Sequence, residues 1–179
     1  MTTTKNIATF KKGVLLHASG VRTSQGALLF MGPSGAGKST ICTLLSDTFE
    51  PITDDVVHIA WREEIGWCVD EGRFYANEES IQANRKLKNY RKEKIAPIHA
   101  IFRIHQNKTP YISRLSQREL CSQIATGILE VAGQNMIYTC FKGLPWFRIA
   151  SELARQKQGY NLHFTQEIDT VEAVSSFMV

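Results

Sequence analysis

The sequence predicts one α/β domain that spans residues 1–179, with a mixed sheet flanked by helices. Three observations lead to this prediction. Strand-like and helix-like segments alternate along the chain, a glycine-rich loop joins one strand to one helix, and no low-complexity linker divides the sequence. The length of 179 residues suits one domain with a hydrophobic core, and 43% hydrophobic with 21% charged residues is ordinary for a globular protein.

The first half of the chain predicts strands around one helix. Residues 13–21 alternate loosely and end after a glycine, and residues 27–32 form a short apolar run like those buried in parallel sheets. Residues 38–48 carry apolar side chains on one helical face. A proline begins the β-rich segment 51–61, and residues 64–77 are typical of two strands joined by turns.

The middle of the chain predicts a strand followed by a long helix. Residues 97–107 alternate as a strand does. Ser116 and Glu119 have the spacing of a capping box, which marks a helix start, and Gly133 marks its end.

The last 35 residues predict helix, strand and helix. Pro145 is expected in the first turn of the first helix, with Gly159 beyond its end. Residues 160–164 form a short strand, and Asp169 with Glu172 is a second predicted capping pair before a final helix.

Composition narrows the class of protein. The four cysteines lack zinc-ligand spacing, so we expect reduced thiols, with Cys42 and Cys121 packed on apolar helix faces. The N-terminus lacks a signal-peptide core, and no apolar run approaches the roughly 18 residues that span a bilayer. The net charge of +4 does not argue for nucleic acid. The sequence therefore predicts a soluble, cytoplasmic protein without membrane or nucleic-acid partners.

The motif with the clearest chemistry is a phosphate-binding loop that fits the GxxxxGK[ST] (Walker A) pattern, with a buried strand before it and a helix after it. Glycines let backbone N–H groups turn toward phosphate oxygens, and the following helix adds its positive end. Lys38 would reach the β- and γ-phosphates of ATP, and the Ser39 hydroxyl would ligate Mg²⁺. The residues expected to bind the nucleotide are Gly32, Pro33, Ser34, Gly35, Ala36, Gly37, Lys38, Ser39 and Thr40.

A Mg²⁺ ion usually needs a carboxylate from a nearby strand end. Residues 97–107 offer none there, so Asp54 and Asp55 are the candidates. In an extended strand these neighbours face opposite sides, so one would face the phosphates while the other ligates metal or caps a backbone group. A simple turn pair remains the alternative.

Two other phosphate-loop classes are disfavoured. A transporter motor needs an LSGGQ signature, and "RLSQREL" has no glycine. A signalling GTPase needs NKxD, and "QNKTP" has Pro110 in place of the aspartate.

The segments "LLHASGV", "GALLFMGPSGAGKST" and "PITDDVVHI" resemble the catalytic domain of bifunctional HPr kinase/phosphorylase. They are more similar to its short single-domain relatives, some of which occur beside peptide biosynthesis genes and phosphorylate a serine of a precursor peptide. The resemblance covers most of the chain, with specific motifs in its first third. It implies the fold shared with phosphoenolpyruvate carboxykinase and ATP-dependent transfer to a hydroxyl.

The resemblance also implies roles for single residues. Asp54 would be the general base for the acceptor hydroxyl, and Asp55 would hold Mg²⁺. His17 would lie close to both and act catalytically by sharing or shuttling a proton; a satisfied interior histidine is the alternative for His17. Thr40 stands where the family has a glutamate, and the family's later glycine-rich signature, with its acidic metal ligand, is absent. Residues 78–79, both glutamates, offer a substitute for that ligand.

The sequence thus predicts an ATP- and Mg²⁺-dependent kinase that acts on a peptide or protein serine. A small-metabolite kinase and a non-catalytic nucleotide-binding regulatory module are the alternatives. The basic segment 84–94 is either a solvated surface or a clamp for an acidic peptide. The three tryptophans are expected in the core. The choice among ATP, GTP and pyrophosphate, any reverse phosphorylase activity and the oligomeric state stay open, and a homo-oligomer is compatible with the sequence.

Overall fold

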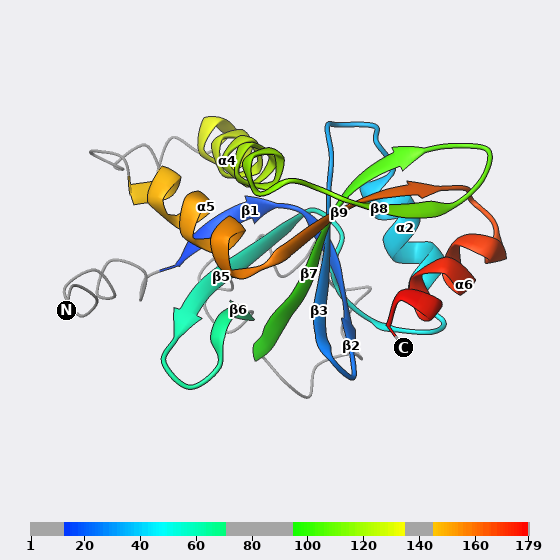
Figure 1. Cartoon of the computed structure of the whole chain (residues 1–179), viewed down its shortest axis with the longest axis horizontal. Helices are drawn as coiled ribbons and strands as arrows, with labels where there is room; N and C mark the ends of the chain where they lie inside the picture. Colours follow the sequence, from blue (N-terminus) through cyan, green and yellow to red (C-terminus); the bar gives the residue numbers. More distant parts are fainter. Residues whose placement is uncertain (1–12, 71–94, 135–144, 179) are drawn as a thin grey trace.

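The computed structural model describes residues 13–70, 95–134 and 145–178 (Figure 1). The strands are β1 (Val14–His17), β2 (Ser19–Thr23), β3 (Gly26–Met31), β4 (Glu50–Thr53), β5 (Val56–Arg62), β6 (Gly66–Asp70), β7 (Ile95–Gln106), β8 (Tyr111–Arg114) and β9 (Gln158–Phe164). The helices are α2 (Lys38–Leu45), α4 (Gln117–Gln134), α5 (Pro145–Gln156) and α6 (Ile168–Phe177).

The strands form one curled, mixed sheet in the order β1-β5-β6-β7-β3-β2-β4, to which β9 and β8 add beside β7. β7 is parallel to β3 and to β9, and its other pairing, with β6, is antiparallel. β7 is twelve residues long and pairs with two strands one after the other along its length: β6 pairs with its start and β9 with its second half. The predicted α/β class with a mixed sheet is confirmed.

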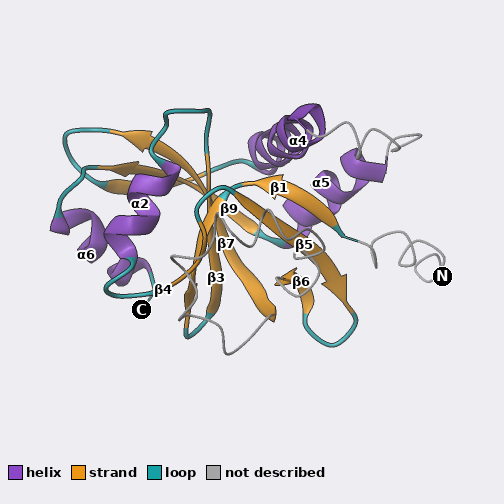
Figure 2. Ribbon diagram, turned by 180° about the vertical axis from the view of Figure 1, so that it is seen from behind, coloured by secondary structure: helices purple, strands orange, loops and turns teal. Residues whose placement is uncertain are grey.

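Two hydrophobic clusters lie on opposite faces of this sheet. α4 and α5 cover one face, and α2 and α6 cover the other (Figure 2). Successive side chains of a strand point to opposite faces, so Leu29 and Met31 of β3 pack in the first cluster while Leu28 and Phe30 pack in the second. This double burial accounts for the uninterrupted apolar run in β3.

Several predicted elements are confirmed. The apolar strand at 27–32 is β3, the strand at 97–107 is β7, and the final strand is β9. The capping box at the start of α4 is present, because the Ser116 backbone N–H donates to Glu119 Oε2 at 2.9 Å and the Glu119 backbone N–H donates to Ser116 Oγ at 3.3 Å.

Two strands predicted as continuous are each broken in two. Residues 13–21 separate into β1 and β2 at Ala18, and residues 51–61 separate into β4 and β5 at a bend. The breaks lie side by side, since the Ala18 N–H donates to the Asp55 carbonyl at 2.9 Å. β1 pairs with β5, whereas β2 pairs with β4, so both segments turn together where the sheet curls.

The predicted cap of the last helix is wrong. α6 begins at Ile168, its N-cap residue is Glu167, and no side chain caps it. The Asp169 carboxylate instead accepts a hydrogen bond from the Thr165 hydroxyl at 2.6 Å. The first predicted helix is also shorter than expected, since α2 ends at Leu45.

The cysteine prediction agrees with the packing, and the tryptophan prediction agrees in part, because Trp61 and Trp146 are only partly buried against the first hydrophobic cluster. Cys42 and Cys68 are buried free thiols, and burial raises the pKa of Cys42 to about 12 and that of Cys68 to about 11. Trp67 is fully buried against Trp61. Cys140 lies outside the described residues. Within the described ranges, no helix is long and apolar enough to cross a bilayer.

Candidate functional site

The glycine-rich loop leaves the end of β3, a strand inside the sheet, and leads directly into α2 (Figure 1). Gly35 and Gly37 have φ angles of +79° and +100°, which side chains other than glycine rarely tolerate. At Gly37 space adds a second restriction, because a Cβ there would lie 2.6 Å from Phe164 Cζ. The loop therefore has the backbone that a phosphate cradle needs.

Lys38 is the buried cation of this loop. Its side chain folds back so that Nζ donates to the Gly32 carbonyl at 2.9 Å and to the Pro33 carbonyl at 3.2 Å. Burial lowers the pKa of the Lys38 ammonium, and the nearby carboxylates of Glu130 and Asp55 oppose that shift. Among the described residues Lys38 forms no ion pair, so neutral carbonyls alone hold a partly desolvated ammonium. That arrangement suits an anion such as a phosphate.

α2 presents an uncovered positive end to the same place. Gly37 is its N-cap residue, no side chain caps it, and its first turn contains no acidic residue. The neighbouring strand β2 fixes the helix, because the buried Ser19 hydroxyl donates to the Lys38 carbonyl at 2.9 Å.

Asp54 and Asp55 occupy the bend between β4 and β5 rather than an extended strand, so the expectation that they face opposite sides of one strand is wrong. The bend adjoins the start of α2, where the Ser39 hydroxyl donates to the Asp54 carbonyl at 3.4 Å. The predicted loop residues and the predicted acid pair are therefore brought together.

His17 links the acid pair to α4. Its Nε2 lies 3.2 Å from Asp55 Oδ1, and its Nδ1 lies 2.6 Å from Glu130 Oε2. The ring is 13% exposed, and both of its nitrogens can donate to these carboxylates only when both carry a proton. The expectation that His17 lies close to the acid pair agrees with this geometry for Asp55.

Glu130 is a site residue that the sequence reasoning missed. It belongs to a helix that was predicted, but no motif connects it with His17, which lies 113 positions earlier. α4 reaches this place because Gly127 packs tightly: a Cβ there would lie 2.5 Å from Met31 Cε and 3.0 Å from Leu16 Cδ1. Glu130 follows three residues later on the same helix face.

The predicted Mg²⁺ site is one in which nucleotide phosphates supply part of the metal's ligands. The described residues contain no group of three or more His, Cys, Asp or Glu that could hold a metal. Mg²⁺ in nucleotide sites is usually held by one or two carboxylates, with phosphates and water completing the shell. Ser39 and Asp55 are the predicted protein ligands, and both lie beside the loop. The substitutes at 78–79 and the basic segment 84–94 lie outside the described residues.

Comparisons with known proteins give one family match. The model of the family described as "ScmC: SynChlorMet cassette protein ScmC" matches residues 1–164. Among solved structures, the chain is similar to the Hpr(Ser) kinase/phosphatase from Coxiella burnetii, with 13% identity and a TM-score of 0.41 over 57% of this chain and 71% of that one. No curated protein matches it.

Proposed function

We propose that this chain, which belongs to the family described as SynChlorMet cassette protein ScmC, is an ATP- and Mg²⁺-dependent kinase. The acceptor is a hydroxyl, with a serine of a peptide or protein as the expected substrate. The observation that carries the proposal is the meeting of a buried lysine in a glycine-rich loop with an acid pair and a histidine from other strands. Kinase chemistry needs both parts: a phosphate cradle and a carboxylate that can take a proton.

Each residue has a proposed role. Lys38 and the loop N–H groups hold the β- and γ-phosphates, while Ser39 and Asp55 hold Mg²⁺, which when bound neutralises phosphate charge. Asp54 accepts the proton of the acceptor hydroxyl. The hydroxyl oxygen then bonds to the γ-phosphorus, the bond from that phosphorus to the β–γ bridging oxygen breaks, and ADP leaves.

Two alternatives remain from the sequence. A small-metabolite kinase would use the same groups on another hydroxyl. A regulatory module that only binds nucleotide has less support, since a binding module needs no base beside the phosphates, and here the backbone carbonyl of Asp54 accepts a hydrogen bond from Ser39 at the start of α2.

The direct test is mass spectrometry of reactions with ATP and Mg²⁺. The word "cassette" in the family description makes peptides and proteins encoded beside this gene the first acceptors to try. We expect one added phosphate on a serine. Tight nucleotide binding without a modified peptide or protein would instead favour one of the two alternatives, and a screen of metabolites with free hydroxyls would separate them.

Glu130 should act as a positioning residue. Its carboxylate holds His17 Nδ1 at 2.6 Å, so Glu130→Gln should release the ring from its place beside Asp55. We expect turnover to fall by about 10- to 100-fold, the range seen when residues behind a metal ligand are removed, with an altered pH profile of turnover.

The matched control is Glu172→Gln, which replaces an exposed carboxylate on α6. This variant should behave as wild type. If Glu130→Gln gives the wild-type pH profile and turnover, the positioning role is wrong.

A further inference from the structure

A cavity of about 530 Å³ lies beside the phosphate loop, where β7 and β9 end and α6 begins. Residues 106–108 form one wall and residues 164–168 form the other. Its size falls within the range of small-molecule sites. None of the predicted site residues lines it.

The cavity and the loop share a boundary. Gly37, the last glycine of the loop, would place a Cβ 2.6 Å from Phe164 Cζ and 3.4 Å from Gln106 Nε2, and both of these residues line the cavity. A ligand that fills the loop with its phosphates can therefore extend directly into this space.

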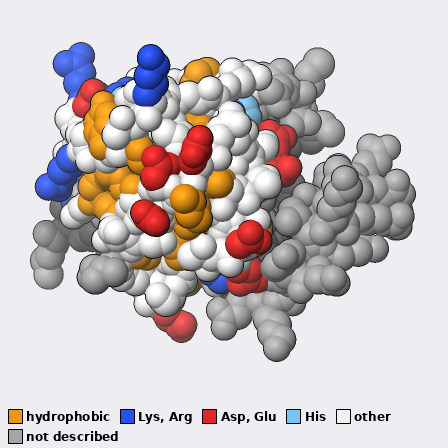
Figure 3. Space-filling view, turned by 90° about the vertical axis from the view of Figure 1, so that its right-hand side faces the viewer, with side chains coloured by type: hydrophobic (Ala, Val, Ile, Leu, Met, Phe, Trp, Pro, Cys, Tyr) orange, Lys and Arg blue, Asp and Glu red, His pale blue; other side chains and the backbone are white. Residues whose placement is uncertain are grey.

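The lining suits an uncharged, flat ligand better than further phosphate. Ile168 is a large apolar side chain that is 67% exposed at the start of α6. Figure 3 views the molecule from the side of α2 and α6 and shows hydrophobic side chains among acidic ones. Glu167 on this wall and Lys108 on the other carry opposite charges, so the lining has no net positive charge that would select a further phosphate. The Glu167 carboxylate can accept hydrogen bonds from ribose hydroxyls.

Among the polar groups that line the cavity, the Gln106 carboxamide is the one that adjoins the last glycine of the loop. The Asn107 carboxamide is engaged, because its Oδ1 accepts from the Lys108 N–H at 2.7 Å and its Nδ2 lies 3.4 Å from His163 Nδ1. The neighbouring Gln106 carboxamide makes no hydrogen bond within the described part of the chain. A carboxamide offers both a donor and an acceptor, which is what the edge of a nucleobase requires.

We propose that this cavity binds the base and ribose of the nucleotide whose phosphates occupy the loop. Gln106 contacts the base edge and Ile168 covers its face. This inference rests on the proposed function, since it assumes that the loop holds a nucleotide. It assigns a place to the nucleoside, for which the sequence offered no residue.

The test compares ATP with tripolyphosphate, which has the phosphate chain without the nucleoside. Calorimetric titrations with Mg²⁺ would measure both affinities for wild type, Gln106→Leu and Ile168→Gln. Neither substitution changes charge, and both positions are exposed, so phosphate binding and folding should persist. We expect each variant to bind ATP about tenfold more weakly, a change of about 1.4 kcal/mol, and to bind tripolyphosphate as wild type does.

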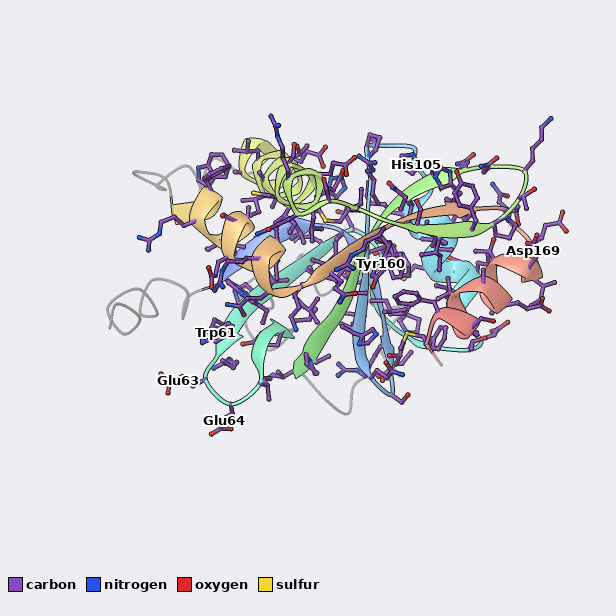
Figure 4. All side chains as sticks on the ribbon, viewed as in Figure 1. Trp61, Glu63, Glu64, His105, Tyr160 and Asp169 are labelled. Carbon is purple, nitrogen blue, oxygen red and sulfur yellow. The ribbon has the colours of Figure 1, made fainter. Side chains whose placement is uncertain are left out.

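Ile65→Gln is the matched control. Ile65 is 43% exposed in the turn between β5 and β6. Figure 4 labels Glu63 and Glu64 in this turn, far from Asp169 at the start of α6. It should leave both affinities unchanged.

Three results would overturn the proposal. Unchanged ATP affinity in both variants would exclude the cavity and leave the kinase proposal standing. Equal losses for ATP and tripolyphosphate would mean that the residues act through the loop. A wild-type chain that binds neither ligand would refute the phosphate loop itself, and this inference with it.

Discussion

ATP with Mg²⁺ should raise the melting temperature of the wild-type chain, and the Lys38→Met variant should lose this rise. Its turnover should fall by about 10²- to 10³-fold, as when one preorganised donor to a reacting centre is removed. Ligand-induced stabilisation is RT ln(1 + [L]/Kd), which is about 2.7 kcal/mol at a ligand concentration of 100 Kd. The loss should thus be readily visible in a thermal melt.

The same substitution should leave the ligand-free protein at least as stable as wild type. The Lys38 ammonium is partly desolvated on neutral carbonyls, and that burial lowers its pKa. Replacing a buried charge by an apolar side chain of similar length removes its desolvation penalty. The two melts, with and without nucleotide, therefore separate a binding defect from a folding defect.

Lys157→Met is the matched control for this experiment. Burial also lowers the pKa of Lys157, but this residue lies between α5 and β9, away from the loop. The Lys157→Met variant should keep the full rise in melting temperature on addition of ATP and Mg²⁺. A Lys38→Met chain that also keeps it, with wild-type turnover, would show that the loop is not the phosphate site.

Asp54→Asn should lower turnover by about 10²- to 10⁴-fold, the usual contribution of a well-placed general base. ATP affinity should change little, because an amide of the same size stays in the bend and Lys38 still holds the phosphates. Steady-state phosphorylation of the acceptor found by mass spectrometry, together with ATP titration, measures the two quantities.

Asp55→Asn distinguishes the two proposed roles. As a Mg²⁺ ligand, Asp55 should be needed mainly for metal affinity, so this variant should require more Mg²⁺ for half-maximal rate. Asp47→Asn, at an exposed carboxylate beyond the end of α2, is the control and should match wild type. If Asp54→Asn keeps full turnover while Asp55→Asn loses it at saturating Mg²⁺, the roles are reversed.

The features that the sequence predicted correctly are those that local residues decide. A buried strand, a glycine loop and a helix follow one another between residues 26 and 45, and each has its own signature. The capping box at Ser116 is equally local, because both partners lie within one helical turn. The structure therefore contains both features, although the helix after the loop ends at Leu45 instead of residue 48.

The features that were missed depend on residues far apart in the chain. The break at Ala18 arises because β1 and β2 pair with different strands, which no pattern within residues 13–21 records. The start of α6 is set by Thr165, whose backbone N–H donates to Thr170 Oγ1 at 2.9 Å, rather than by Asp169 and Glu172. The contact between His17 and Glu130 was missed for the same reason, because these residues lie far apart in the sequence.

The long strand β7 has a further consequence for how the molecule loses its structure. Its side chains enter both hydrophobic clusters, with Ile101 in one and Phe102 in the other, and β3 beside it does the same. If α4 and α5, or α2 and α6, left the sheet, one face of β3 and β7 would be exposed to water while the other face stayed covered. We therefore expect the described core to behave as one cooperative unit, in which the glycine-rich loop, attached to the end of β3, loses its structure only when the whole sheet does.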